Sequence, residues 1–393
     1  MADLRTSLLG LALSNPILPA AGPPGRDGAA LLACAAGGAG ALVAKTISTR
    51  AAVPPTPNMA EIQHGMVNTE LWSEMPPERW IEHEYALART AGLPLIVSLG
   101  YSPDEIAELA PRIAPFADAV ELSTHYVGTD PEPMVGAVRA AKAALDVPVM
   151  VKLSPHRDDM AATARAAADA GADGIVAINS FGPVLSIDIE TATPRLGGAN
   201  GYGWISGPAL KPLAIRCVRD IARAVDLPIV GVGGVSTGRD AVEMLMAGAT
   251  AVGVCTAAIL KGPQVFGRIA RELGEWLDAH GYESVADIRG AALTRAWPSG
   301  PLPAPRIKDS CNGCAICVTA CVYGAITMAD DRAVIDDARC TRCGLCVTRC
   351  RLDAIDWLPG DVPSAPLRSM VRGRSTQTEP PSGSATELPA RKA

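Results

Sequence analysis

The chain has 393 residues, a formal net charge of −6 and 48% hydrophobic side chains, and this length predicts at least two domains. The acidic balance excludes a general electrostatic attraction to nucleic acid or to an anionic membrane surface. No apolar span is long enough for a membrane helix or fits a secretory signal, so we expect a soluble, cytoplasmic protein. In a reducing compartment, its eleven cysteines predict metal ligands rather than disulfides.

Eight short apolar runs alternate with Ala-rich stretches that have helical periodicity. The predicted strands span residues 16–22, 41–48, 94–100, 119–124, 148–154, 174–180, 228–234 and 251–257. Three of the predicted helices span residues 134–145, 160–170 and 239–247. Continuous apolar strands joined by helices predict a parallel sheet that is covered on both faces. Eight such units favour a (β/α)8 TIM barrel, with a doubly wound open sheet as the alternative.

After the eighth predicted strand, changes in amino-acid composition mark the end of the barrel domain and the segments that follow it. Helices are expected at 265–277 and 284–293, and they complete a barrel domain of residues 1–295. Residues 296–306 are rich in proline and predict a linker, because they cannot continue a helix. Residues 307–358 form a compact Cys-rich unit, and we expect residues 359–393 to be disordered because they are poor in apolar side chains.

The Cys-rich unit contains the spacing C-x2-C-x2-C-x3-C twice, at 311–321 and at 340–350. This is the bacterial ferredoxin spacing, in which the fourth cysteine of each run binds the other cluster. It predicts a small α+β domain with two [4Fe–4S] clusters. The predicted ligands are Cys311, Cys314, Cys317 and Cys350 for one cluster, and Cys340, Cys343, Cys346 and Cys321 for the other. Two zinc sites are the alternative, although zinc sites rarely need a fourth ligand three residues after the third.

Iron–sulfur clusters transfer one electron at a time and do not by themselves perform a two-electron reaction. A flavin can exchange electrons either singly or in pairs, so the barrel is expected to bind a flavin. In a TIM barrel the chemistry lies where the strands end, and polar residues gather at these positions here. Lys152 stands in an otherwise apolar strand, where an anion would have to meet it or the side chain would have to reach the rim. Gly233-Gly234 and Cys255-Thr256 end the seventh and eighth predicted strands, where barrels commonly bind phosphate.

Several motifs in this order resemble the dihydroorotate dehydrogenase-like flavoprotein family, and most closely the flavin and iron–sulfur part of dihydropyrimidine dehydrogenase. The resemblance covers roughly residues 11–358. It rests on the doubled cysteine runs and on Asn15-Pro16, Val43-Ala-Lys45-Thr46, Met66-Val-Asn68-Thr-Glu70-Leu-Trp-Ser-Glu74, Val151-Lys152-Leu-Ser-Pro155, Ala177-Ile-Asn179-Ser180 and Ser206-Gly207-Pro-Ala-Leu-Lys-Pro212.

The resemblance implies FMN as the flavin and assigns roles to the matching residues. Lys152 would stabilise the reduced, anionic flavin. The implied FMN-binding residues are Ala21, Gly22, Lys45, Thr46, Lys152, Asn179, Ser206, Gly207, Gly233, Gly234, Cys255 and Thr256. The implied substrate-binding residues are Asn68, Glu70, Ser123, Asn179 and Ser180.

The chain departs from the family after the fourth predicted strand. Relatives carry Asn-x-Ser-Cys-Pro there, and its cysteine exchanges a proton with a substrate carbon. Here the stretch reads Ser123-Thr-His125-Tyr126, so that Tyr126 stands in place of the cysteine. A phenol or an imidazolium can supply that proton, which makes Tyr126 or His125 the predicted proton donor and Lys152 the third catalytic residue.

The resemblance implies an oxidoreductase that acts on a CH–CH or C=C bond of a small cyclic or conjugated carbonyl compound. No Gly-x-Gly-x-x-Gly follows an early strand, so electrons are expected from an NAD(P)H-oxidising flavoprotein subunit or a ferredoxin. We also expect a homo- or hetero-oligomer. A non-catalytic electron-transfer or scaffold subunit is the alternative, favoured by the altered proton-donor stretch. Reduction of tRNA uridine is disfavoured because the sequence has no basic stripe.

Overall fold

The structure is a computed structural model that describes residues 1–123, 128, 130–156, 159–295 and 302–357. Within this part of the chain, residues 1–293 and 294–357 form two compact units. The first contains the predicted barrel, and the second contains the cysteine runs. None of the helices in the described residues is both long and apolar enough to cross a bilayer.

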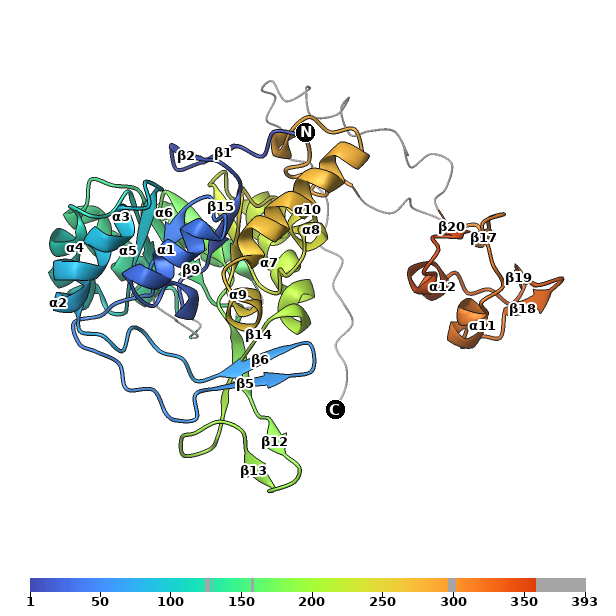
Figure 1. Ribbon diagram of the computed structural model, residues 1–393, viewed down its shortest axis with the longest axis horizontal. Helices are drawn as coiled ribbons and strands as arrows, with labels where there is room; N and C mark the ends of the chain where they lie inside the picture. The colour runs from blue at the N-terminus through green and yellow to red at the C-terminus, as the bar shows by residue number, and fades with distance from the viewer. Residues whose placement is uncertain (124–127, 129, 157–158, 296–301, 358–393) are drawn as a thin grey trace. The chain divides into compact units, whose positions relative to one another are not determined.

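The first unit is a nearly closed barrel of eight parallel strands surrounded by helices (Figure 1). Its strands follow the order β3-β16-β15-β10-β9-β8-β7-β4, and between β3 and β4 the Gly40 N–H donates to the Ile17 carbonyl at 2.8 Å. The TIM barrel prediction is therefore confirmed, and the open-sheet alternative is wrong. The strands are β3 Ile17–Pro19, β4 Leu42–Val43, β7 Leu95–Leu99, β8 Ala119–Leu122, β9 Val149–Leu153, β10 Gly174–Ala177, β15 Ile229–Val232 and β16 Ala251–Val254.

The barrel interior is filled mainly by aliphatic side chains. Alternate residues of the strands, such as Val43, Ile96 and Met150, form one buried cluster. Leu8 and Leu13 belong to the same cluster and come from a short hairpin, β1 Thr6–Leu8 with β2 Leu11–Leu13. Because this hairpin packs against the interior, it contributes to the core. It was not predicted from the sequence.

The helices pack their apolar faces on the outside of the barrel, in a second and larger core. The predicted helices at 134–145, 160–170, 239–247 and 265–277 are confirmed within two residues at each end. The helices are α1 Gly28–Ala36, α2 Pro77–Arg79, α3 Tyr85–Arg89, α4 Pro103–Ile113, α5 Glu132–Ala144, α6 Met160–Asp169, α7 Lys211–Ala224, α8 Gly238–Met246, α9 Thr256–Lys261 and α10 Val265–Ala279, with a π-helical turn at Trp80–Glu84.

The helix predicted at 284–293 is wrong. The structure has only a 3-10 turn there, Val285–Asp287. Gly290 adopts a φ of +71°, which ends helical geometry. Its N–H donates to the Leu245 carbonyl at 2.9 Å, and the Ala292 N–H donates to Met246 at 2.9 Å. Backbone groups that a helix would have used internally therefore bind the end of α8 instead.

Two insertions that follow β4 and β10 form a separate four-stranded antiparallel sheet, which was not predicted (Figure 1). Its order is β11-β14-β6-β5, so segments more than 100 residues apart pair side by side. For example, Asn68 of β6 lies opposite Trp204 of β14. The strands are β5 Met59–Ile62, β6 Gly65–Asn68, β11 Phe181–Val184 and β14 Gly203–Ser206, and a further ladder joins β12 Ile187–Asp188 to β13 Thr193–Pro194.

The second unit repeats one small motif. Each half has a cysteine loop followed by a five-residue helix, α11 Ile316–Ala320 or α12 Leu345–Arg349. Two antiparallel ladders complete it: β17 Arg306–Ile307 with β20 Ile355–Asp356, and β18 Ile326–Ala329 with β19 Arg332–Ile335. Of the predicted linker, residues 296–301 lie outside the described residues, as does the predicted disordered tail.

Candidate active site and cysteine module

A cavity opens where the barrel strands end, and it gathers the residues predicted for the flavin and the substrate. All the described members of both predicted sets line it. They are Ala21, Gly22, Lys45, Thr46, Asn68, Glu70, Ser123, Lys152, Asn179, Ser180, Ser206, Gly207, Gly233, Gly234, Cys255 and Thr256. The predicted proton donors His125 and Tyr126 lie outside the described residues, directly after Ser123.

Lys152 is buried at the end of β9, where it shares the inward face of the strand with Met150. Its Nζ lies 3.5 Å from Glu121 Oε1 and 3.4 Å from the Ala21 carbonyl oxygen. Glu121 is the anion that a buried lysine requires. Both contacts are long, and an ammonium carries three donors. Lys152 can therefore still donate to an acceptor in the cavity, which fits the polar edge of a flavin.

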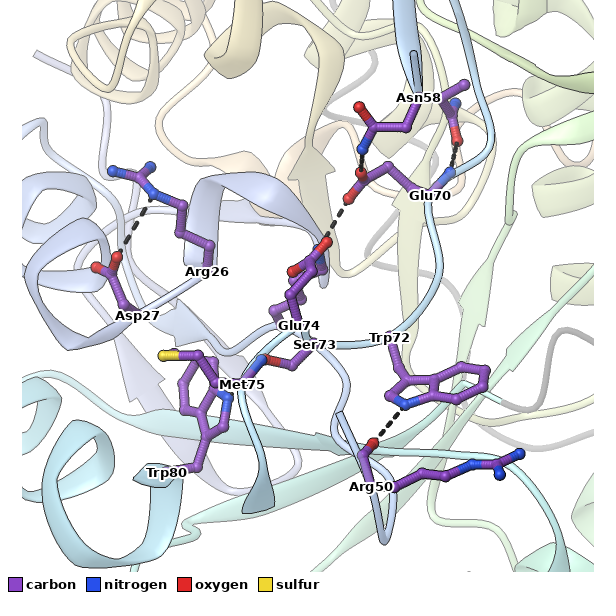
Figure 2. A network of polar contacts seen from close by, with 12 residues as sticks. Arg26, Asp27, Arg50, Asn58, Glu70, Trp72, Ser73, Glu74, Met75 and Trp80 are labelled. Atoms are coloured by element: carbon purple, nitrogen blue, oxygen red, sulfur yellow. Dashed lines mark hydrogen bonds and ion pairs between the residues drawn. The ribbon is translucent and has the colours of Figure 1, made fainter. Parts of the chain in front are cut away.

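Lys45 is the centre of a second charged group at the same end of the barrel. Its Nζ lies 2.9 Å from Glu70 Oε2 and 2.7 Å from Glu74 Oε2. Asn58 Nδ2 donates to the other Glu70 oxygen at 2.6 Å. Both Glu70 oxygens therefore already have partners in the protein, as Figure 2 shows for Asn58.

Asn68 and Asn179 are held by the backbone at the edge of the cavity. Asn68 Nδ2 donates to the Trp204 carbonyl at 3.2 Å, and its Oδ1 accepts from the Glu70 N–H at 3.2 Å. Asn179 is fixed through its own N–H, which donates to the Leu153 carbonyl at 2.9 Å. Its side-chain oxygen accepts from the Ser180 N–H at 2.8 Å. These contacts orient both amides before any ligand binds.

Glycines and hydroxyls line the part of the cavity near β15 and β16. Gly207 and Gly234 have φ values of +91° and +76°, which side chains other than glycine rarely adopt. A Cβ on Gly234 would lie 2.8 Å from the Gly207 carbonyl oxygen, so the two loops approach closely. Thr256 Oγ1 donates to Ser206 Oγ at 2.9 Å and joins the end of β16 to the same loop. Burial raises the pKa of the neighbouring Cys255 thiol to about 11, so this thiol stays protonated.

Sequence reasoning assigned no role to four residues of this region: Glu74, Glu121, Trp72 and Tyr101. Glu121 could have been found, because a second charge in a buried strand next to Lys152 predicts a pair. The two aromatic residues could have been noticed from the scarcity of such side chains, which make up only 4% of the chain. The contact of Glu74 with Lys45 depends on a loop path that periodicity does not predict.

The cysteine module contains two cavities, each lined by four cysteines. Cys311, Cys314, Cys317 and Cys350 line one of them, and Cys321, Cys340, Cys343 and Cys346 line the other. These are the two ligand sets that the spacing predicts. All eight are free thiols. In the described residues no three Cys, His, Asp or Glu side chains converge on a single ion.

Backbone N–H groups point at the sulfur atoms of this module. The Ala325 N–H donates to Cys321 Sγ at 3.3 Å, and the Ala354 N–H donates to Cys350 Sγ at 3.2 Å. Hydrogen bonds from the backbone N–H groups of Ala333 and Gly313 lower the pKa of the Cys311 thiol. Such bonds favour the thiolate form that binds iron, whereas burial raises the pKa of the Cys317 and Cys346 thiols. The donor set therefore fits iron–sulfur clusters.

Comparisons with known proteins agree with this geometry. Residues 3–277 match the family described as dihydroorotate dehydrogenase. The chain belongs to the dihydroorotate dehydrogenase family. Residues 310–354 match a second family, the 4Fe-4S dicluster domain, which favours iron–sulfur clusters over the zinc alternative. The protein is therefore a flavin-type oxidoreductase barrel joined to a 4Fe–4S ferredoxin domain.

Relatives in the dihydroorotate dehydrogenase family bear the name dihydroorotate dehydrogenase B (NAD(+)), catalytic subunit. The protein of Methanothermobacter thermautotrophicus is 41% identical over 301 residues, covering 74% of this chain and 98% of the relative. That of Thermococcus kodakarensis is 36% identical, covering 75% and 99%. That of Geobacter sulfurreducens is 37% identical, covering 74% and 98%. Each alignment leaves about a quarter of this chain uncovered, so these relatives match it over nearly their whole length while this chain has additional sequence.

Proposed function

We propose that this protein is an FMN-dependent oxidoreductase that interconverts a C=C bond and a CH–CH bond of a small cyclic or conjugated carbonyl compound. Reduction adds two electrons and two protons to the double bond, and oxidation removes them. Two [4Fe–4S] clusters, held by the eight cysteines, relay the electrons to or from a partner. The observation that carries the proposal is that one chain combines the lined cavity at the barrel mouth with two four-cysteine cavities.

FMN, when bound, would supply the exchange between single electrons and hydride. The glycine and hydroxyl residues near β15 and β16, with Ser206 and Gly207, would hold its phosphate and ribityl chain through backbone N–H groups. Lys45, Thr46, Ala21 and Gly22 would border its ring. Lys152, which retains donor capacity, would hydrogen-bond its polar edge and balance negative charge there.

The substrate would contact Asn68, Glu70, Ser123, Asn179 and Ser180, which line the same cavity. Tyr126 would give the proton to the substrate carbon, or His125 would do so in its place. The order of the motifs supports a reaction like that of dihydropyrimidine dehydrogenase. The names of the relatives support dihydroorotate, but the loss of the Asn-x-Ser-Cys-Pro stretch weighs against the same substrate here.

Electrons would come from an NAD(P)H-oxidising flavoprotein subunit or from a ferredoxin, in a homo- or hetero-oligomer. The words "catalytic subunit" in the names of the relatives support such a partner. A second candidate function, an electron-transfer or scaffold subunit without substrate chemistry, is favoured only by the altered proton-donor stretch.

Cofactor analysis of anaerobically purified full-length protein tests the proposal. Denaturation should release about one FMN per chain, and the protein should contain about eight irons. Full iron content without flavin would support the scaffold function. Zinc in place of iron would contradict both.

A further inference from the structure

Glu121 is an acidic side chain buried in the wall of the barrel, where it is 2% exposed. Its neighbours across the sheet are Ser98 of β7 and Met150 of β9. Met150 belongs to the apolar cluster of the interior, so Glu121 shares the inward face of the sheet with it. A carboxylate at such a position costs free energy unless a cation compensates it. Its presence there therefore points to an electrostatic role.

Lys152 is the cation that compensates Glu121. Its Nζ lies 3.5 Å from Glu121 Oε1, and both side chains are at most 5% exposed. Within the described residues, this carboxylate oxygen has no hydrogen-bond partner, so the interaction is an attraction of charges rather than a directional hydrogen bond. Lys152 lines the cavity and Glu121 does not. The ammonium is therefore the member of the pair that a ring in the cavity would contact.

Within the described part of the chain, none of the other charged groups of the cavity forms an ion pair with Lys152. Besides Lys152, the titratable side chains of the lining are Lys45, Glu61, His64, Glu70 and Lys261. Lys45 is buried and already pairs with Glu70 and Glu74. Glu61, His64 and Lys261 are exposed, so water and salt screen their charges. Glu121 is therefore the buried counter-charge of Lys152.

A buried pair of charges beside a flavin affects the two redox states of the flavin unequally. Reduction by two electrons, with uptake of one proton, leaves the ring with a negative charge that the oxidised ring does not carry. A cation close to the ring favours the reduced state, and an anion close to the ring favours the oxidised state. The two charges of the pair therefore act in opposite directions, and removal of the carboxylate leaves the ammonium uncompensated.

We propose that Glu121 limits how strongly Lys152 stabilises the reduced flavin, so that the flavin can pass its electrons on to the clusters. An uncompensated ammonium in a poorly hydrated site would hold the electrons on the flavin. Glu121 does not line the cavity, so it acts through Lys152 and is not a catalytic residue. This inference rests on the proposed function and adds to it a residue that sets how the cofactors share electrons.

Redox equilibration of the cofactor-loaded, full-length protein with a reference dye tests the inference. The protein is reduced anaerobically, the flavin and the dye are read from the absorption spectrum, and the reduced clusters are quantified by electron paramagnetic resonance. At a fixed state of the dye, we expect Glu121→Gln to raise the ratio of reduced to oxidised flavin at least about tenfold, which equals about 30 mV for a two-electron couple. Glu121→Asp keeps the charge and should change this ratio by no more than about threefold. The FMN phosphate is the same in every variant, so the comparison isolates the pair.

A double variant keeps the test decisive if Glu121→Gln alone does not fold. Lys152→Met combined with Glu121→Gln removes both charges and leaves neither of them buried without a partner. Because the two charges oppose each other, their joint removal should lower the flavin ratio by no more than about tenfold. The matched control is Glu84→Gln, since Glu84 is another buried carboxylate of the barrel and pairs with Arg79 at 2.7 Å outside the cavity lining. It should change the ratio by no more than about twofold.

The outcomes separate failure of the inference from failure of the proposed function. A rise of less than about tenfold in Glu121→Gln, or a fall, would overturn the inference while the proposed function stands. A fall of more than about tenfold in the double variant would do the same, because Lys152 would then act at full strength despite Glu121. An equal rise in Glu84→Gln would also overturn the inference. If the purified wild-type protein contains no flavin, the proposed function fails and the inference fails with it.

Discussion

The barrel and the cysteine module bury their interiors by different means. In the barrel, the strands and helices form two continuous apolar clusters. Protein side chains alone fill this core, and the cavity lies above it. The core of the module is small and consists of Cys317, Ile326, Ala333, Cys346 and Ile355, so that two of its five buried members are predicted cluster ligands. Below about 70–80 residues, an apolar core of this kind rarely suffices.

This difference indicates that the barrel can fold before its cofactor binds, whereas the module depends on its clusters for an interior. In the barrel, the proposed cofactor site is a cavity in which backbone hydrogen bonds already orient side chains such as Asn68 and Asn179. In the module, the metal would replace the missing side chains, as structural metals do in other small domains. The following experiments test that contrast, from the largest expected effect to the smallest.

Removal of iron should affect the two units unequally. After chelation of the reduced protein, we expect amide protection in residues 302–357 to fall at least ~100-fold, because the module loses the centre of its core. Protection in β7, β9 and β10 of the barrel should remain. Hydrogen exchange measured by mass spectrometry distinguishes the two regions. Retained amide protection in the iron-free module would contradict the claim that the module depends on its clusters for its interior.

Lys152→Met should destabilise the flavin-free barrel by about 3–5 kcal/mol, because it leaves the buried Glu121 carboxylate without a cation. The double variant with Glu121→Gln should recover most of this loss. Urea unfolding of the full chain, followed by tryptophan fluorescence, measures both. As a control, Lys142→Met removes an exposed pair with Asp173 and should cost no more than about 1 kcal/mol. Equal losses at the two lysines would show that burial of the Lys152 pair is unimportant.

Tyr126→Phe tests whether the barrel site holds its cofactor independently of the reacting group. Turnover should fall by on the order of 10²-fold, since the proposed proton donor is lost, while flavin content and flavin reduction stay unchanged. Steady-state rates and the flavin spectrum measure the two properties separately. Full activity would eliminate Tyr126 as the acid, and a matching loss in His125→Gln would assign that role to His125.

The two halves of the module carry different residues at a position with left-handed backbone. Ala315 and Gly344 both follow the second cysteine of their runs with left-handed backbone, at φ values of +57° and +78°. A Cβ on Gly344 would lie 2.6 Å from Trp357 Cζ3. Gly344→Ala should therefore lower the melting temperature of the module, whereas Ala315→Gly should raise its stability by about 1 kcal/mol or less. Calorimetry of the iron-loaded protein checks both, and opposite signs would contradict the assigned geometry.

The elements that sequence periodicity predicts well are those whose pattern is local. All eight barrel strands and the long helix α10 follow from apolar runs and turn residues. The helix expected at 284–293 failed because Gly290 and Ala292 bind the end of α8, a tertiary contact that no local pattern indicates. The sheet that joins β6 to β14 was missed for the same reason, since its partners are far apart in the chain.

The features of the candidate active site likewise divide into those that a local sequence pattern predicts and those that depend on tertiary contacts. Residues at strand ends, such as Lys152 and Asn179, could be placed at the cavity because the carboxyl ends of barrel strands meet there. The compensation of Lys45 by Glu74 and the pairing of Trp72 with Tyr101 depend on how loops fold back over the barrel. Sequence reasoning therefore located the site but not its charge balance or its shape.

A reductive titration tests the central claim most directly, that a barrel flavin and two clusters share electrons within one chain. The oxidised protein is titrated anaerobically with dithionite while flavin absorbance and the electron paramagnetic resonance of reduced clusters are recorded. The account predicts an uptake of about four electrons per chain, two by the flavin and one by each cluster. An uptake of two electrons or fewer, without a cluster signal, would contradict it.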